Sequence, residues 1–268
     1  MKSAACVLDL RDAVSIPDRV DQEIPFVDTP GPELVVHPDA DQVFVEQYRR
    51  LGAALHHAQH HEGVRSVVIA SAVEGEGKTL SATNLALVLS HSFKKRVLLV
   101  DGDLRKPSIH EVLRLPNHTG LSDHLTRPDA TLPTQALSPA LSIMTGGQAA
   151  VDPVALLVSD GLRQLLDAAR GAFDWIIVDT PPVLLFPDAG LVASKVDRCV
   201  LVVGAATTSS TAAEKAVAAI GASRILGVAL NRAEPSEIAA GYRYGSYRYA
   251  GKRASGVRGW WGGGPRRD

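Results

Sequence analysis

The fold of this chain is decided by one stretch, ASAVEGEGKTLSAT, at residues 70–83. It follows an apolar run, VRSVVIAS at 64–71, that is typical of a buried strand, and it leads into a helical segment that starts at Lys78. Gly75 and Gly77 allow the turn to bend tightly, so that backbone N–H groups come close to an anion. Oriented amides, a helix N-terminus and one lysine together bind phosphate groups. The stretch therefore predicts a phosphate-binding loop between a strand and a helix.

The loop follows a known pattern, GxxxxGK(S/T), which runs here from Ala72 to Thr79 with alanine in place of the first glycine. Two later segments, RVLLVDGDLRKP at 96–107 and DWIIVDTPP at 174–182, place acidic residues directly after apolar strands. A single aspartate there could be a turn or a helix cap. Because the carboxyl ends of parallel strands meet at one edge of a sheet, we expect these acids beside the loop. They are Asp101, Asp103 and Asp179.

Strands and helices alternate along the chain, which predicts parallel strands joined by crossover helices. We expect an α/β fold of three layers, in which a mostly parallel, doubly wound sheet has helices on both faces. Residues 1–40 are expected to be a flexible leader, 41–234 the phosphate-loop domain, and 235–268 a flexible tyrosine-rich tail. The expected strands cover 64–71, 95–101, 141–145, 174–179, 198–203 and 224–231, and the expected helices 79–92, 108–114, 153–170, 187–194 and 210–221, after a first helix capped by Asp41.

The composition fits one sizeable core, because 46% of the 268 residues are hydrophobic. A net charge of −1 gives no global basic field, and we expect no nucleic-acid partner. Cys199 lies in an apolar run and is expected to be a small core residue, which fits a reducing compartment. No apolar stretch approaches the roughly 18 to 20 residues that span a bilayer, so we expect a cytoplasmic protein.

Five side chains are expected to carry the chemistry of a nucleotide site that uses ATP and Mg²⁺. Lys78 should meet the β- and γ-phosphates, and the Thr79 hydroxyl should bind Mg²⁺, a hard cation that prefers oxygen ligands. Asp179 has the position of a second metal-site carboxylate, which usually acts through a water ligand. Asp101 is expected near the metal and the acceptor hydroxyl, with Asp103 assisting. The loop residues expected to contact the nucleotide are Gly75, Glu76, Gly77, Lys78, Thr79 and Leu80.

The tail holds four tyrosines separated by Gly, Arg and Ser in GYRYGSYRY, at 241–249. A buried aromatic cluster would need apolar neighbours, and this segment has almost none. An exposed and flexible segment of this kind suits modification. The alternative is a segment that associates with itself or stacks on nucleic-acid bases.

Over roughly residues 41 to 250, this combination resembles the bacterial tyrosine kinases of capsule and exopolysaccharide synthesis. That family is a cytoplasmic autokinase domain related to the partition and septum-site ATPases, so the resemblance implies a P-loop NTPase fold and an ATP-dependent tyrosine autokinase. The resemblance rests on the loop at 71–79, VLLVDGDLRKP, TGLSDHL, DPVALLVS, IIVDTPP, ILGVALN and the terminal tyrosine cluster.

The resemblance also implies roles and partners. Asn231, at the end of ILGVALN, is expected near the adenine. The implied partners are a transmembrane adaptor of the chain-length-determinant type, protein tyrosine substrates, a cognate phosphotyrosine phosphatase and other copies of the chain. Recruitment to the inner face of the cell membrane is expected through the adaptor. The implied phosphoacceptors are Tyr242, Tyr244, Tyr247 and Tyr249, and the implied Mg-ATP and transfer site is Lys78, Thr79, Asp101, Asp103 and Asp179.

Three positions depart from the family pattern. Glu74 stands where the family usually has proline, which puts an extra carboxylate beside the phosphates. Val73 stands where partition ATPases have a signature lysine, so that sister family fits less well. Gly52 replaces the last arginine of the helix motif E-x-x-R-x-x-R, which puts ring assembly in question. Two alternatives stay open: a partition or septum-type ATPase switch, and a non-catalytic ATP-binding regulator of a membrane partner.

Overall fold

The computed structural model describes residues 30–127 and 131–233, and the four tail tyrosines therefore lie outside the described residues. Within these ranges, seven strands form one sheet in the order β3-β4-β2-β5-β1-β6-β7. All neighbouring strands are parallel except β3 and β4. The strands are β1 (Ser66–Ser71), β2 (Val97–Asp101), β3 (Gln135–Ser138), β4 (Leu141–Met144), β5 (Trp175–Asp179), β6 (Arg198–Gly204) and β7 (Ile225–Asn231).

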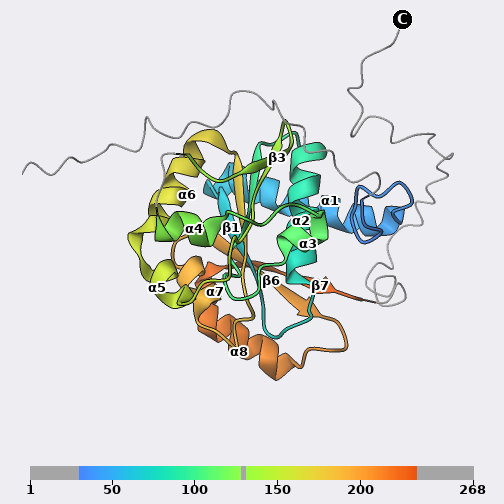
Figure 1. The fold of residues 1–268 in the computed structure, drawn as a ribbon. Coiled ribbons are helices and arrows are strands. Elements are labelled where there is room, and N and C mark those ends of the chain that lie inside the picture. Colours follow the sequence, from blue (N-terminus) through green and yellow to red (C-terminus); the bar gives the residue numbers. More distant parts are fainter. Residues whose placement is uncertain (1–29, 128–130, 234–268) are drawn as a thin grey trace, which may run out of the picture.

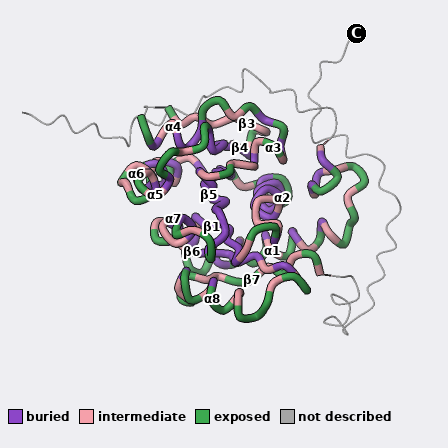
Figure 2. The backbone as a smooth tube through the Cα atoms, turned by 60° about the horizontal axis from the view of Figure 1, so that its bottom comes forward, coloured by how far each residue is buried: buried purple, intermediate pink, exposed green. Residues whose placement is uncertain are grey.

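Helices cover both faces of the sheet, as Figure 1 shows for α2 and α3 on one side and α5 and α6 on the other. The central strands β1, β2 and β5 are buried at every residue, whereas the edge strands β3 and β7 are partly exposed (Figure 2). Side chains alternate along β1, where Val67 and Ile69 join one core cluster and Val68 and Ala70 join the other. This arrangement confirms the predicted three-layer, doubly wound fold. The α-helices are α1 (Gln42–Glu62), α2 (Lys78–His91), α3 (Ile109–Leu113), α4 (Leu121–Thr126), α5 (Pro153–Val158), α6 (Asp160–Ala172), α7 (Asp188–Ala193) and α8 (Ser210–Ile220); a 3-10 turn, η2 (Ala222–Arg224), follows α8.

The structure differs from the expected elements in three short segments. The edge strand β3 was not predicted, and it pairs antiparallel with β4. Helix α4 was not predicted either; the Asp123 carboxylate at its start accepts the Gly120 N–H at 2.9 Å. The single helix expected over 153–170 is instead two helices, because the backbone of Ser159 is extended (φ −56°, ψ 161°). The Ser159 hydroxyl donates to the carbonyl of Leu156 at 2.6 Å, which helps to end α5.

The segment before α1 packs on the domain, although residues 30–40 were expected to belong to a leader. Its Leu34 and Val36 side chains are buried in the core beneath α1 and α2. The Asn84 side chain on α2 accepts the Val35 N–H at 2.8 Å and also donates to a backbone carbonyl of the same segment. Residues 30–40 of the expected leader therefore pack against the side of the domain that carries α2.

Helix α1 begins at its predicted cap, since the Asp41 carboxylate accepts the Val43 N–H at 2.8 Å. Gly52 is buried where α1 meets the end of α2, and a Cβ at this position would lie 2.8 Å from the Phe93 ring. An arginine could not take the place of Gly52 without moving that ring. No helix in residues 30–127 and 131–233 has the length and apolar character that crossing a membrane requires.

Candidate active site

The phosphate loop lies at the carboxyl end of β1, where Gly75 and Gly77 have positive φ angles of 83° and 87°. These are backbone conformations that glycine adopts without strain. None of the amide N–H groups from Gly75 to Leu80 donates a hydrogen bond to a described residue. Buried or half-buried amides need acceptors, so this row at the start of α2 is a cradle for phosphate oxygens. The geometry fits the predicted contacts of residues 75–80 with a nucleotide.

Lys78 is the cation of the site, and its Nζ lies 4.0 Å from Oδ2 of Asp103. Both side chains are nearly buried, with 13% and 8% of their surface exposed. The other oxygen of Asp103, Oδ1, accepts the backbone N–H groups of Arg105 and Lys106 at 3.3 and 3.0 Å. Burial raises the pKa of Asp103, while these amides and the Lys78 charge act in the opposite direction. Asp103 therefore has one oxygen fixed by backbone and one oxygen facing the lysine.

Asp101 ends β2 and holds the loop that follows it. Its Oδ2 accepts the N–H groups of Ser108 and Ile109 at 2.8 and 2.9 Å, and its Oδ1 accepts the Asp103 N–H at 3.2 Å. Burial, followed by the charge of Asp179, raises the pKa of Asp101 to about 7. Its lone pairs already serve three amides, so in this structure Asp101 shapes the loop that carries Asp103.

Asp179 ends β5 and pairs in register with Asp101 on the neighbouring strand β2. Its carboxylate is fully buried, and neither oxygen has a hydrogen-bond partner among the described residues. Burial raises the pKa of Asp179 to about 6, and the charge of Lys78 and the Thr79 hydroxyl lower it. A buried carboxylate without a partner next to a hydroxyl is the donor set expected for a hard cation. The residues present therefore fit Mg²⁺, which Thr79 and Asp179 would hold; their role as metal ligands stays a prediction.

The described ranges hold no cluster of three or more His, Cys, Asp or Glu side chains arranged to bind a metal. Mg²⁺ does not require such a cluster, because that ion usually takes one or two protein ligands and completes its shell with phosphate and water oxygens. The predicted metal role of Asp101 stays a prediction.

The side chain of Glu76 does not face the phosphate cradle. Only 2% of its surface is exposed, and its carboxylate accepts N–H groups of Val73 and Gly204 and the Thr208 hydroxyl. Sequence reasoning named Glu76 only as part of the loop and missed this role. The partners on the β6 side lie 128 and 132 residues further along the chain, so no local pattern pointed to them.

Asn231 reaches the same loop from the end of β7. Its Nδ2 donates to the carbonyl of Glu76 at 2.8 Å, and it would lie 2.2 Å from a Cβ at position 77. Gly77 is therefore required both by its positive φ and by this close approach. The predicted position of Asn231 near an adenine stays a prediction.

Three further residues beside the site were not predicted from the sequence to have a role there. Arg105 makes a bidentate ion pair with Asp188, with N–O distances of 2.9 and 3.0 Å, and its guanidinium lies 4.2 Å from the centroid of the Phe186 ring. Asp188 is fully buried at the start of α7. The pair ties the loop after β2 to the segment after β5, the two segments that carry the site acids.

Glu74, the departure from the family pattern, is exposed. Its carboxylate lies 3.4 Å from Nζ of Lys106, which is also exposed. The extra negative charge beside the loop is thus partly offset by a neighbouring lysine, and water screens both groups.

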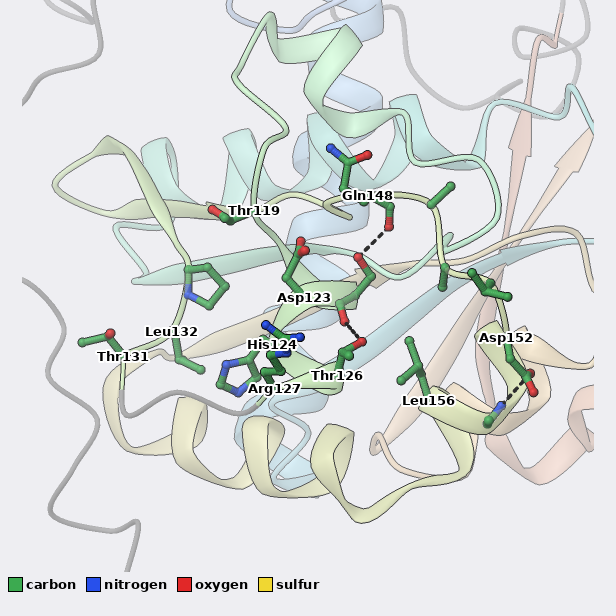
Figure 3. Close-up of a pocket in the computed structure, with 16 residues that line it drawn as sticks. Thr119, Asp123, His124, Thr126, Arg127, Thr131, Leu132, Gln148, Asp152 and Leu156 are labelled. Carbon is green, nitrogen blue, oxygen red and sulfur yellow. Dashed lines mark hydrogen bonds between the residues drawn. The ribbon is translucent and has the colours of Figure 1, made fainter.

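A separate cavity of about 810 Å³ lies between α4 and the loop that leads from β4 into α5 (Figure 3). Gln148 and Asp152 of that loop line it, together with Asp123 and His124 of α4. Gly146 in the same loop lies close to the site acids, since a Cβ at this position would be 3.7 Å from the carboxyl carbon of Asp101. None of the residues predicted to bind nucleotide or metal lines the cavity.

Comparisons with known proteins agree with this geometry. A ParA family profile, described as NUBPL iron-transfer P-loop NTPase, matches residues 63–234. Tyrosine-protein kinase YwqD of Bacillus subtilis is 36% identical over 192 residues, which cover 69% of this chain and 80% of YwqD. The solved kinase domain of Escherichia coli tyrosine kinase ETK is 31% identical with a TM-score of 0.70, covering 76% of this chain and 81% of that one. The chimerical protein CapA2B2 is 30% identical with a TM-score of 0.69, covering 76% and 92%.

The matched range, 63–234, includes all seven strands, the phosphate loop and the strand-end acids. The identity to YwqD extends over most of both chains, which a shared fold alone does not require. A phosphate-binding loop, a lysine and strand-end carboxylates are the parts that an enzyme of phosphoryl transfer needs. The chain therefore belongs to the bacterial tyrosine-protein kinases, within the ParA-like P-loop NTPases.

Proposed function

We propose that this chain transfers the γ-phosphoryl group of ATP to tyrosine hydroxyls, including its own Tyr242, Tyr244, Tyr247 and Tyr249. The proposal is carried by one observation: the amides of residues 75–80 donate to no described residue, and the Lys78 ammonium in the same row lies 4.0 Å from Asp103, one of three buried carboxylates at the strand ends. A triphosphate would accept hydrogen bonds from the amides and pair with Lys78, and a cation would neutralise the carboxylates. Thr79 and Asp179 would hold Mg²⁺, which would supply positive charge to offset the negative charge of the phosphates.

In the transfer step, the tyrosine oxygen forms a bond to the γ-phosphorus while the bond from that phosphorus to the β,γ-bridging oxygen breaks. The bonding electron pair leaves with ADP. The hydroxyl proton passes to the Asp101 and Asp103 pair, where Oδ2 of Asp103 is the oxygen not occupied by a backbone amide. Lys78 stabilises the charge that develops on the phosphoryl oxygens.

The same proposal includes a cellular role in polysaccharide synthesis and export, with a transmembrane adaptor that recruits the chain to the inner face of the membrane. A phosphotyrosine phosphatase would reverse the modification. Relatives named as tyrosine-protein kinases, among them YwqD and ETK, support the activity of this chain. The tail tyrosines support an autokinase, because they are four of the chain's five tyrosines.

The activity is tested with labelled ATP and Mg²⁺, followed by mapping of phosphotyrosine. We expect label on the four tail tyrosines of the wild-type chain and none on Lys78→Met. Release of inorganic phosphate without phosphotyrosine would instead identify an ATPase switch. ATP binding with neither product would identify a non-catalytic regulator.

A mixing experiment decides whether transfer occurs between molecules. A Lys78→Met chain that keeps its tyrosines is incubated with an active chain whose four tail tyrosines are replaced by phenylalanine. We expect phosphate on the inactive chain. Its absence, together with activity of the wild-type chain alone, would mean that transfer is intramolecular.

A further inference from the structure

Glu76 is a buried carboxylate inside a loop that receives anions. It stands between Gly75 and Gly77, yet only 2% of its surface is exposed. A carboxylate pointing into the phosphate cradle would repel a nucleotide. In this structure the Glu76 side chain turns away from the cradle and toward β6, so its burial needs a reason other than contact with phosphate.

Three donors from two segments surround the Glu76 carboxylate. Within the phosphate loop, Oε2 accepts the Val73 N–H at 2.7 Å. From the end of β6 and the loop after it, Oε1 accepts the Gly204 N–H at 3.1 Å and a short hydrogen bond from the Thr208 hydroxyl. Hydrogen bonds to a charged acceptor are stronger than neutral ones, and a buried carboxylate deprived of its donors is unfavourable.

A second contact fixes the backbone of the same residue. The Glu76 carbonyl accepts Nδ2 of Asn231, at the end of β7. Both the side chain and the backbone of Glu76 are thus held by the ends of β6 and β7, while the amides of residues 75–80 remain free of partners among the described residues. The loop is therefore fixed by hydrogen bonds at Glu76, whereas its amides donate to no described residue where phosphate would bind.

We propose that Glu76 is a positioning residue that links the phosphate loop to Gly204 and Thr208, and that this link sets how tightly the loop binds a triphosphate. The side chain of Glu76 touches neither phosphate nor acceptor; only its backbone N–H belongs to the row of amides. It acts by keeping the loop in the shape in which the amides converge, so that little ordering remains to be done when nucleotide binds. The proposal rests on the nucleotide binding proposed above and adds the loop after β6 as a determinant of affinity.

Removing the Thr208 hydroxyl is the least disruptive way to test the link between Glu76 and the loop after β6. Thr208→Val removes the hydroxyl and keeps the shape, whereas Thr208→Ser keeps the hydroxyl and is the matched control. Two quantities are measured on the nucleotide-free full chain and its variants: the Kd for a non-hydrolysable ATP analogue with Mg²⁺, and the rate of amide hydrogen exchange in peptides covering residues 66–80 and 199–209.

We expect Thr208→Val to raise the Kd about 10-fold, which corresponds to a fall in the binding-competent fraction of the loop to about one tenth. Hydrogen exchange should become faster in both peptides, because the Val73 and Gly204 N–H groups donate to the two oxygens of the same Glu76 carboxylate. Thr208→Ser should resemble the wild type in both measurements. Glu76→Gln, which places an amide donor against the donors around it, should match or exceed the effect of Thr208→Val.

Wild-type affinity in Thr208→Val would overturn the proposal. So would faster exchange confined to 199–209, because Thr208 would then hold only its own loop. If no variant, nor the wild type, binds the nucleotide, the proposed function fails, and the exchange rates at 66–80 still decide whether Glu76 links the two segments.

Discussion

Replacing Lys78 with methionine should do more than stop phosphoryl transfer, because this lysine is also the cation facing the site acids. Its Nζ lies 4.0 Å from Asp103, and its charge lowers the pKa of both Asp103 and Asp179. Methionine has a similar length and no charge, so the change removes the ammonium with little change in packing. The nucleotide-free protein should therefore lose stability.

The size of this loss follows from the burial of the pair. Removing one partner of a buried ion pair lowers the free energy of unfolding by about 3–5 kcal/mol. The contact between Lys78 and Asp103 is longer than a direct hydrogen bond, and about a tenth of each side chain is exposed, so we expect roughly 1–3 kcal/mol at pH 8. For a domain of this size, each kcal/mol lowers Tm by about 2–4 °C.

The loss should be smaller at pH 6. Burial raises the pKa of Asp101 to about 7 and that of Asp179 to about 6, both above the ordinary value of an aspartate. At pH 6 these carboxyls take up protons in place of the missing cation, whereas at pH 8 they are charged and repel one another.

Urea unfolding followed by circular dichroism, in the presence of EDTA, measures the effect at the two pH values. Lys106→Met is the matched control, because Lys106 makes an exposed contact with Glu74 and its loss should change the free energy of unfolding by less than about 0.5 kcal/mol. Equal unfolding free energies for Lys78→Met and the wild type at pH 8 would refute the idea that Lys78 stabilises the acid group.

Three other outcomes are expected. Asp197→Asn should lower the free energy of unfolding by about 1–3 kcal/mol at pH 7. Burial alone would raise the pKa of Asp197, but Arg170 and neighbouring donors hold it below its ordinary value. The difference in unfolding free energy between this variant and the wild type, measured with urea, should therefore shrink below about pH 4. Gly77→Ala should weaken ATP binding about 10-fold in titration calorimetry, because a left-handed alanine costs about 1–2 kcal/mol and the new methyl displaces Asn231; unchanged affinity would contradict the observed close contact. Asp179→Asn should slow transfer about 100-fold while changing the Kd for ATP only a few-fold, and a proportional loss of both would argue against a metal role.

The sequence predicted those parts of the site that depend on local chemistry. Gly75 and Gly77 are needed for a turn with positive φ, and Asp101 and Asp179 follow apolar strands whose parallel pairing brings them into register. Each of these features is visible in a stretch of about ten residues. The alternation of strands and helices likewise predicted the sheet and its two helical layers.

The features that sequence reasoning missed depend on distant partners or on very short elements. The burial of the Glu76 carboxylate depends on hydrogen bonds from Gly204 and Thr208, which are more than 120 residues away. From the sequence alone, an acid inside a phosphate loop suggests that it repels the nucleotide and not that it holds the loop in shape. The strand β3 is only four residues long and pairs with β4 across a tight connection, so it shows no sustained alternation. Ser159 interrupts an apolar pattern that would otherwise continue as one helix.

The distribution of charge within the site argues that ATP and Mg²⁺ should bind cooperatively. In the proposed function, the amides of residues 75–80 and Lys78 attract phosphate, whereas Asp101, Asp103 and Asp179 beside Lys78 carry charge that repels it. A divalent cation bound by Asp179 reverses that repulsion, and a triphosphate in turn supplies the oxygen ligands that a single buried carboxylate cannot. Because coupling between two ligands is reciprocal, Mg²⁺ should raise the affinity for ATP by the same factor by which ATP raises the affinity for Mg²⁺.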